Sequence, residues 1–372
     1  MKKIIFITGT RADFGKLKSL IEITLASKKY EVHIFATGMH MNSKYGKTVE
    51  EIYKCKFPNV YTFINHSESD TMDNVLGNTI LGFSNYIKEC KPDLIVIHGD
   101  RSEALAGAIV GALNNILVAH IEGGEVSGTI DELIRHAVSK MSHIHFVSNE
   151  KAKKRLIQMG ELSRSIFVIG SPDIDVMKSS NLPSFEEAKG HYDIEFNDYG
   201  LVLFHPVTTE IDKIKEYAHC LVDALLQSEE NYIVVYPNND LGSSIILQEY
   251  EKIKSKKNIR IFPSIRFEYF LVLLKKSQFI LGNSSAGIRE APYYGIPTIN
   301  IGSRQNNRTT NNEIINTGHS TEELLQAIKR AKSISVEKIS LFGEGNSDEL
   351  FLQVINDENF WEIDKQKQFV DL

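Results

Sequence analysis

The sequence predicts an α/β protein built from two doubly wound domains that face each other across a cleft. Short apolar runs of four to seven residues alternate with helical patterns along most of the 372-residue chain, which is typical of parallel βαβ units. The alternation stops between residues 171 and 199, where two prolines and several serines occur, and it restarts at residue 201. A chain of this length can also form two domains, each with its own core.

The expected elements form two sets. In the first half, strands are predicted at residues 4–8, 32–37, 94–98, 117–121, 144–147 and 166–169, with helices between them, for example at 14–26, 79–90 and 150–159. In the second half, strands are predicted at 201–204, 233–236, 259–262, 279–282 and 298–301. We therefore place the first domain at residues 1–172 and the second at 173–354. A final helix at 355–372 is expected to fold back onto the first domain.

The composition is ordinary for a globular protein, with 42% hydrophobic residues, 24% charged residues and a net charge of −6. The densest basic stretch, residues 252–257, is interrupted by uncharged residues, so we expect no nucleic-acid partner. The three cysteines (Cys55, Cys90 and Cys220) lie far apart and form no CxxC motif. This pattern favours a reducing compartment and argues against a structural zinc site.

The first residues are expected to form a strand rather than a signal peptide. The apolar run at residues 4–7 is short, and the charged residues Arg11, Asp13 and Lys16 follow it closely. No apolar segment reaches the ~20 residues that a membrane helix needs. We therefore expect a cytoplasmic protein with no membrane partner.

Acidic residues follow two strands of the first domain. Asp100 comes just after the strand at 94–97 and Glu122 just after the apolar run 116–121, while Asp131 ends a polar loop ahead of a helix. If these strands are parallel neighbours, both carboxylates emerge at one edge of the sheet, where ligands bind in open α/β sheets. The acid cluster indicates a catalytic site. Alternatively, these acids are helix caps and loop residues, which are common at strand-to-helix turns.

The turn after the first strand, residues 9–16, has the position of an anion or sugar site. Free backbone N–H groups and the helix dipole favour anions there, and Arg11 within the turn favours ligand contact. The spacing fits neither a Walker A loop nor GxGxxG, so no dinucleotide cofactor is predicted. The alternative is a tight turn in which Asp13 caps the helix.

A second strand-to-helix turn, residues 282–290, has the same character. Small residues let the backbone approach a diphosphate, and the hydroxyls of Ser284 and Ser285 add donors. Glu290 could accept hydrogen bonds from both hydroxyls of a ribose. The alternative is a capped helix with Glu290 on its solvent face.

Other polar residues have roles that stay open. His205 ends the first strand of the second domain, where it could bind phosphate, protonate a leaving group or serve a structural role. Asp173 and Asp175 form a DxD sequence directly after a proline, where acids commonly start a helix, so we predict no metal site there. His143 and His145 are expected to form a half-exposed pair on one face of a strand.

Together these motifs resemble the hydrolysing UDP-N-acetylglucosamine 2-epimerases of bacterial sialic acid synthesis. The likeness spans nearly the whole chain, in order, and is more specific than any single motif. The matching segments are residues 9–13, 98–101, 120–125 with 127–131, 205–209, 282–285 with 289–290, and 302–305.

The resemblance implies the two-domain, Rossmann-like fold of glycosyltransferase group B, with UDP held mainly by the C-terminal domain. It implies a UDP-sugar substrate, a homodimer, and no cofactor or metal. The implied catalytic residues are Asp100, Glu122, Asp131 and His205. The implied substrate contacts are Arg11, Arg101, Ser284 and Ser285 at the phosphates, Phe267 at uracil, Glu290 at ribose and His40 in the sugar pocket.

The implied reaction removes the C2 proton as UDP leaves C1, which gives a glycal. Protonation of C2 on the other face and addition of water at C1 then yield N-acetylmannosamine. Base and acid stand on opposite sides of the ring, so one carboxylate cannot easily serve as both; which carboxylate does which stays open. Three alternatives remain: the same reaction on UDP-2,4-diacetamido-2,4,6-trideoxyglucose for legionaminic-acid-type sugars, a non-hydrolysing epimerase, and a protein that only binds UDP-sugars.

Overall fold

The computed structural model describes residues 1–66, 71–127, 130–305 and 313–371. The chain forms two compact units. Unit 1 comprises Met1–Glu125, Asp131–Lys178 and Phe342–Leu372, and unit 2 comprises Val126–Ile130 and Ser179–Leu341. Residues 173–178 and 342–354, which the sequence assigned to the second domain, therefore belong to unit 1, because their contacts are made there.

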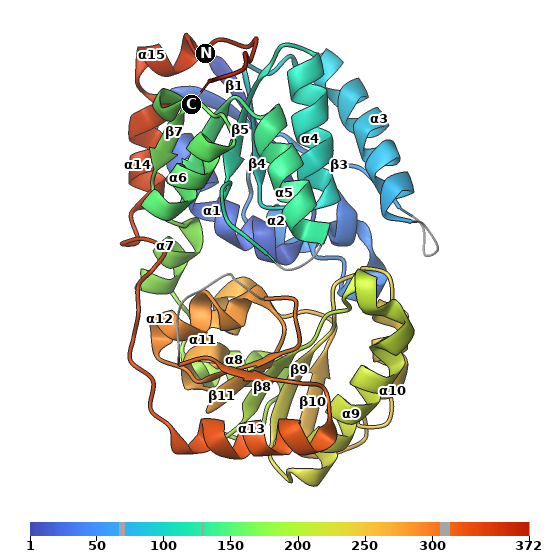
Figure 1. Ribbon diagram of the computed structural model, residues 1–372. Coiled ribbons are helices and arrows are strands. Elements are labelled where there is room, and N and C mark those ends of the chain that lie inside the picture. Colours follow the sequence, from blue (N-terminus) through green and yellow to red (C-terminus); the bar gives the residue numbers. More distant parts are fainter. Residues whose placement is uncertain (67–70, 128–129, 306–312, 372) are drawn as a thin grey trace. The chain divides into compact units, whose positions relative to one another are not determined.

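Unit 1 contains, within the described residues, a seven-stranded parallel sheet in the order β3-β2-β1-β4-β5-β6-β7 (Figure 1). The strands are β1 (Lys2–Thr8), β2 (Tyr30–Ala36), β3 (Val60–Thr62), β4 (Leu94–His98), β5 (Leu117–Ile121), β6 (Ile144–Val147) and β7 (Ile166–Val168). All of them except β3 were predicted. β3 was missed because its three residues, Val60–Thr62, are only partly buried or exposed and form no continuous apolar run, unlike those of β7.

Helices cover both faces of this sheet, which explains why its central strands read as continuous apolar runs. On one face of the sheet, Ile4 and Phe6 of β1 lie in a core with residues of the helices at 11–26 and 347–355. On the other face, Ile7 lies against Gly107 of the helix at 102–113. The helices are α1 (Arg11–Ala26), α2 (Val49–Lys54), α3 (Met72–Cys90), α4 (Ser102–Leu113), α5 (Ile130–Met141), α6 (Glu150–Gln158), α7 (Pro172–Lys178), α14 (Ser347–Ile355) and α15 (Glu358–Trp361).

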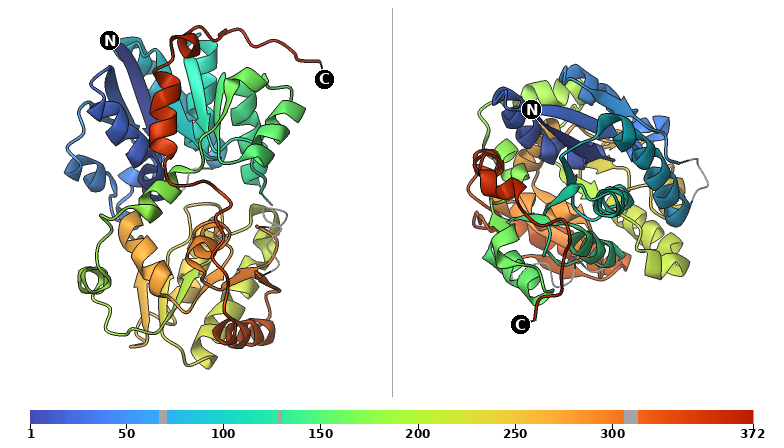
Figure 2. Two further views of the ribbon diagram at one scale, coloured as in Figure 1. Left: turned by 90° about the vertical axis from the view of Figure 1, so that its left-hand side faces the viewer. Right: turned by 90° about the horizontal axis from the view of Figure 1, so that it is seen from above.

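The C-terminal segment is part of the core of unit 1. Figure 2 shows α14 beside the sheet, and Phe351 of α14 is fully buried against Phe6 and Phe146, with ring centroids 6.3 and 4.9 Å away. The Tyr30 hydroxyl donates a hydrogen bond to the carbonyl of Ile355 (2.6 Å). These contacts make the last thirty or so residues a structural layer of unit 1.

Unit 2 contains a six-stranded parallel sheet in the order β10-β9-β8-β11-β12-β13 among the described residues. Its edge strand β13 was not predicted, because it too forms no continuous apolar run. The strands are β8 (Gly200–Leu203), β9 (Tyr232–Val235), β10 (Ile259–Phe262), β11 (Phe279–Gly282), β12 (Thr298–Ile301) and β13 (Ile315–Thr317). The helices are α8 (Phe185–Tyr192), α9 (Ile214–Gln227), α10 (Ser243–Tyr250), α11 (Phe267–Lys276), α12 (Glu290–Tyr294) and α13 (Thr321–Ser333).

Two parallel-sheet α/β units confirm the predicted fold class. In the part of the chain that the structure describes, no helix is both long and apolar enough to cross a bilayer.

Candidate active site

The predicted acids lie at one edge of the sheet of unit 1. Strands β4 and β5 are parallel neighbours whose register pairs His98 with Ile121. Asp100 comes two residues after His98, and Glu122 comes directly after Ile121. Both residues therefore leave the sheet at its carboxyl edge, as expected. Asp131 occupies the first turn of α5 and is half-buried.

A buried arginine of α5 joins the two strand ends. Arg135 is 2% exposed. One of its terminal nitrogens donates to the Asp100 carboxylate, and the other donates to the Glu122 carbonyl oxygen at 2.7 Å. Asp131 lies four residues before Arg135 and therefore on the same face of α5. Arg135 thus fixes the helix that carries the third acid against the turns that carry the other two.

The side chain of Glu122 lies in a polar interior and is 4% exposed. Its Oε1 accepts a hydrogen bond from the Ser171 hydroxyl (2.6 Å) and lies 3.7 Å from the Lys16 ammonium. Its Oε2 lies 3.4 Å from His98 Nε2. The φ angle of Glu122 is 67°, a left-handed conformation that costs a non-glycine residue about 1 kcal/mol or more. Strain of this kind is concentrated at functional sites.

The DxD sequence starts a helix, as expected, and each of its acids has a protein partner. Asp173 is fully buried, and its carboxylate lies 3.4 Å from Lys16 Nζ. Asp175 accepts hydrogen bonds from the backbone N–H groups of Ser347 (2.9 Å) and Asp348 (3.0 Å), and so caps α14. Burial raises the pKa of Asp175 to about 6, although these hydrogen bonds oppose the shift.

The turn between β1 and α1 has the structure that we gave as the alternative. The Asp13 carboxylate accepts hydrogen bonds from the backbone N–H groups of Gly9 (3.0 Å) and Thr10 (2.9 Å), and Thr10 and Asp13 form a capping box. The expectation of free backbone N–H groups in this turn was therefore wrong for Gly9 and Thr10. Arg11 forms an ion pair with Glu51 (2.6 Å). Its contact with phosphate stays a prediction.

His40 lies in the interior of unit 1. It is 0% exposed, and its two ring nitrogens make hydrogen bonds with the hydroxyls of Thr8 (2.9 Å) and Thr48 (2.7 Å). Burial lowers its pKa to about 4, with the Asp13 carboxylate opposing this shift. This geometry gives His40 a structural role in the turn after β2, and its contact with a sugar stays a prediction. Arg101 precedes α4, with its Nε 3.6 Å from Glu103.

Unit 2 contains a polar cluster of its own at the carboxyl ends of β8, β11 and β12. Asn283 is 1% exposed. Its side chain accepts from the backbone N–H of His205 (2.7 Å) and donates to the His205 carbonyl (2.8 Å). Its own carbonyl accepts from Arg304 (3.1 Å) and Gln305 (2.8 Å). Gly282 has φ 143°, and a Cβ there would overlap the Leu203 carbonyl, so only glycine permits the close approach of β8 and β11.

The imidazole of His205 has a defined tautomer when neutral. Its Nδ1 accepts a hydrogen bond from the Asn238 backbone N–H at 3.0 Å, which leaves the ring hydrogen on Nε2. His205 is 6% exposed. A histidine held in this way can present an N–H donor from Nε2, the form required to stabilise a diphosphate oxygen.

The turn after β11 has the cap of the alternative that we gave, but not its exposed glutamate. Ser284 caps the short 3-10 turn Ser285–Gly287, and both serines are half-buried. Glu290 begins α12 and is 3% exposed, so the alternative that placed Glu290 on a solvent face was wrong. Phe267 begins α11 and is 6% exposed. Ligand contacts by these four residues stay predictions.

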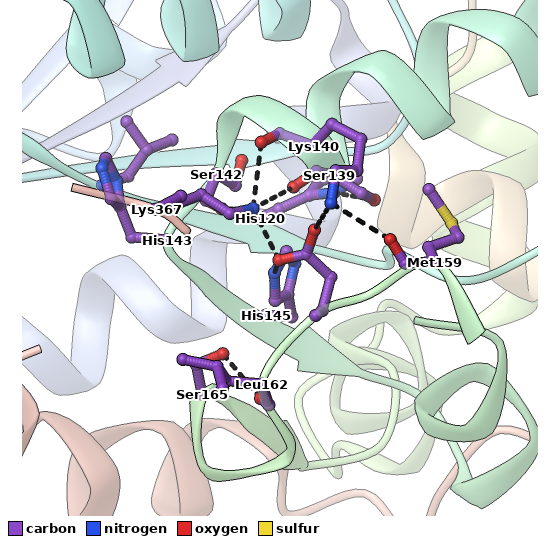
Figure 3. Close-up of polar contacts among 12 residues, drawn as sticks. His120, Ser139, Lys140, Ser142, His143, His145, Met159, Leu162, Ser165 and Lys367 are labelled. Atoms are coloured by element: carbon purple, nitrogen blue, oxygen red, sulfur yellow. Dashed lines mark hydrogen bonds and ion pairs between the residues drawn. The ribbon is translucent and has the colours of Figure 1, made fainter. Parts of the chain in front are cut away.

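The far end of α5 is also anchored within unit 1, as Figure 3 shows. Lys367 Nζ donates to the carbonyls of Ser139 (3.3 Å), Lys140 (2.9 Å) and Ser142 (2.6 Å), where a cation is favoured by the helix dipole. It also pairs with Glu161 at 2.5 Å. Burial alone would raise the pKa of Glu161, but hydrogen bonds from His145 and Lys140 and the charge of Lys367 lower it to about 2.

His120 connects α5 to the turn that carries Asp100. Its Nε2 donates to the Gly99 carbonyl (2.8 Å), and its Nδ1 accepts from the Ser139 hydroxyl (3.1 Å), as Figure 3 shows for the serine side. Burial lowers the pKa of His120 to about 3, so the ring is neutral near pH 7. The nearby His143 and His145 are 4% and 0% exposed, so the expectation of a half-exposed pair was wrong. Both are enclosed by the C-terminal segment and Glu161.

Comparison with known proteins identifies the family. The sequence profile described as UDP-N-acetylglucosamine 2-epimerase matches residues 24–356. A relative with the same name from Neisseria meningitidis serogroup B is 51% identical, and the match covers 100% of both chains. The chain belongs to the UDP-N-acetylglucosamine 2-epimerase family.

Two further relatives of this epimerase-family chain bear on its fold and chemistry. A UDP-N,N'-diacetylbacillosamine 2-epimerase (hydrolyzing) from Legionella pneumophila is 34% identical over 95% of this chain and 96% of that protein. The crystal structure of Methanocaldococcus jannaschii UDP-GlcNAc 2-epimerase in complex with UDP-GlcNAc and UDP superimposes with a TM-score of 0.80, at 25% identity, over 96% of this chain and 99% of that one. The predicted family resemblance is thus confirmed at the level of 2-epimerase.

Several residues of the two polar clusters in this epimerase-family chain were not selected from the sequence. Lys16, His98 and Ser171 surround Glu122, Arg135 joins the strand ends, and Asn283 joins the strands of unit 2. All five lie in or beside motifs that we had noted. The signal that could have found Arg135 is its spacing from Asp131 on one helix face; for Ser171, no local signal exists.

Proposed function

We propose that the protein is a hydrolysing UDP-N-acetylglucosamine 2-epimerase that converts UDP-N-acetylglucosamine and water into N-acetylmannosamine and UDP, the first step of sialic acid synthesis. The observation that carries the proposal is the junction of Asp100 and Glu122 through one buried arginine, in a chain of this family. Two carboxylates held at one sheet edge supply an acid and a base for inversion at C2.

The two carboxylates have different surroundings, which suits different roles. The Asp100 side chain is 22% exposed and pairs with Arg135, whereas that of Glu122 is 5% exposed and is contacted by a hydroxyl, an ammonium and an imidazole. Environments that separate two carboxyl groups in this way are a recurring basis for dividing acid and base work. Asp131 completes the proposed set from α5.

The departing diphosphate needs positive charge and donors. We assign this role to Arg11, Arg101, Ser284 and Ser285, with the Nε2 hydrogen of His205 assisting departure. Glu290 would bind the ribose and Phe267 would contact the uracil. As charge develops on the sugar ring and the diphosphate, acids and donors would stabilise opposite ends of the transition state.

A second candidate substrate is UDP-2,4-diacetamido-2,4,6-trideoxyglucose, in a pathway to legionaminic-acid-type sugars. The L. pneumophila relative, which is named for a hydrolysing reaction on a diacetylbacillosamine nucleotide, favours this candidate. The higher identity to the meningococcal UDP-N-acetylglucosamine 2-epimerase favours the first.

Incubation with each UDP-sugar in deuterated water tests the proposal. Free N-acetylmannosamine with deuterium at C2 is the expected product, detected by NMR and mass spectrometry. Turnover of only the diacetamido sugar would select the second substrate, and UDP-N-acetylmannosamine as product would indicate a non-hydrolysing enzyme. Binding of both UDP-sugars without turnover would contradict the proposal and favour a UDP-sugar sensor.

A further inference from the structure

Ser171 lies where the chain leaves the sheet of unit 1. It follows β7 and directly precedes α7, and it is fully buried. Its backbone N–H donates a hydrogen bond of 2.6 Å to the carbonyl of Phe342, the residue at which the chain returns to unit 1. The outgoing and returning segments are therefore joined at this serine.

Two glycines bring these segments into backbone contact. Gly170 has φ 83° and Gly343 has φ 124°, conformations that glycine adopts without strain. A Cβ on Gly343 would lie 2.7 Å from Gly170 Cα, and a Cβ on Gly170 would lie 3.1 Å from Gly343 Cα. Any larger residue at Gly343 would push the segments apart and shift the backbone of Ser171.

The side chain of Ser171 points in the other direction, to the proposed catalytic acid. Its hydroxyl lies 2.6 Å from Glu122 Oε1, and it is the donor because an ionised carboxylate only accepts. Asp173, two residues after Ser171, forms an ion pair with Lys16. The Lys16 ammonium also lies 3.7 Å from Glu122 Oε1. One short segment thus contributes both the hydroxyl on Glu122 and the counter-charge of the neighbouring lysine.

We infer that Ser171 is a positioning residue that fixes the Glu122 carboxylate and couples its orientation to the crossing of the two connecting segments at Gly170 and Gly343. The inference rests on the proposed function of Glu122 in proton transfer at C2. A hydrogen bond to a charged group in the interior selects one rotamer of the carboxylate and stabilises its ionised form. A carboxylate that must reach one face of a sugar ring loses rate when its orientation is not fixed.

The first experiment compares Ser171→Ala and Ser171→Thr with wild type. We expect S171A to lower kcat by about tenfold to a hundredfold, with little change in KM or in UDP affinity, because a hydrogen bond to a charged group is lost. S171T keeps the hydroxyl and should recover most of the rate. Ser165→Ala is the matched control, since Ser165 is also buried but donates to the Leu162 carbonyl. An unchanged kcat in S171A, or equal losses in S171A and S165A, would refute the inference.

The second experiment is a double-mutant cycle with Gly343→Ala. If the crossing acts through Ser171, G343A should lower kcat in the wild-type background and have little further effect in S171A. Strictly additive losses would show that the crossing acts on the site by another route. Thermal unfolding of each variant separates these effects from loss of fold.

A crystallographic comparison keeps the inference testable if wild type does not turn over UDP-N-acetylglucosamine. The Glu122 carboxylate is expected to rotate or become disordered in S171A with the backbone of residues 120–125 unchanged. An unmoved, ordered carboxylate would overturn the positioning role, whereas an inactive wild type with a displaced carboxylate in S171A would count against the proposed function alone.

Discussion

The guanidinium of Arg135 donates a hydrogen bond to the carboxylate of Asp100 from a side chain that is only 2% exposed. A second hydrogen bond from the same guanidinium holds the carbonyl of Glu122. The fork of an arginine can satisfy two acceptors in fixed directions, whereas a lysine supplies one compact charge. The relative placement of the two strand-end acids therefore depends on this side chain.

Replacing Arg135 with lysine should reduce turnover by at least tenfold while preserving the fold. The charge near Asp100 remains, but one ammonium on a shorter side chain cannot reproduce both hydrogen bonds. Arg135→Met should in addition destabilise the protein by about 3 kcal/mol, because it removes one partner of a largely buried ion pair. Urea unfolding and steady-state kinetics measure the two effects. Wild-type activity in R135K would show that the positions of the two acids do not depend on the paired hydrogen bonds of the guanidinium.

Replacement of each proposed catalytic acid by its amide should spare UDP binding and reduce turnover severely. Loss of a general acid or base typically costs about a hundredfold to ten-thousandfold, and we expect losses in this range for Asp100→Asn, Glu122→Gln and Asp131→Asn. Calorimetric titration with UDP and the deuterium assay give the two readouts. An amide variant with full activity would remove its residue from the catalytic set.

The stability of the protein should fall as the pH decreases from about 6.5 towards 4. Burial lowers the pKa of His40 to about 4 and that of His120 to about 3, whereas both return to about 6.5 on unfolding. In this window the unfolded chain binds more protons at these two histidines, which outweighs the one proton that the folded chain gains at Asp175. The free energy of unfolding therefore decreases as the pH falls. Urea unfolding between pH 7 and 4 measures the slope.

Two variants test the origin of this slope. Replacement of His40 with Asn should flatten it, while replacement of the exposed His191 with Gln should leave it unchanged. An identical slope in wild type and H40N would show that His40 does not contribute to the acid sensitivity.

Replacing Lys367 with methionine should lower the free energy of unfolding by about 2 kcal/mol. The substitution removes the cation at the end of α5 and one partner of the buried Glu161. The matched control is Lys365→Met, because the side chain of Lys365 is exposed. Hydrogen exchange of the amides of α5 should increase in K367M and not in K365M. Equal stabilities of the two variants would contradict a role for Lys367 in anchoring the helix.

Much of the fold could be predicted because its elements are local. The alternation of apolar runs and helical patterns predicted the strands of both sheets except β3 and β13, three-residue edge strands with no recognisable pattern. The placement of Asp100 and Glu122 at one sheet edge also followed, since it requires only that β4 and β5 are parallel neighbours.

By itself, the sequence determined the fold class, the family and the position of the acids at the ends of two strands. Tertiary structure decided which side chains surround those acids: Arg135 contacts Asp100 across 35 positions and Ser171 contacts Glu122 across 49. It also decided that His40 and His143 are interior residues. The physical reason is that backbone periodicity depends on neighbours in the chain, whereas a partner in the interior is chosen by how distant segments pack.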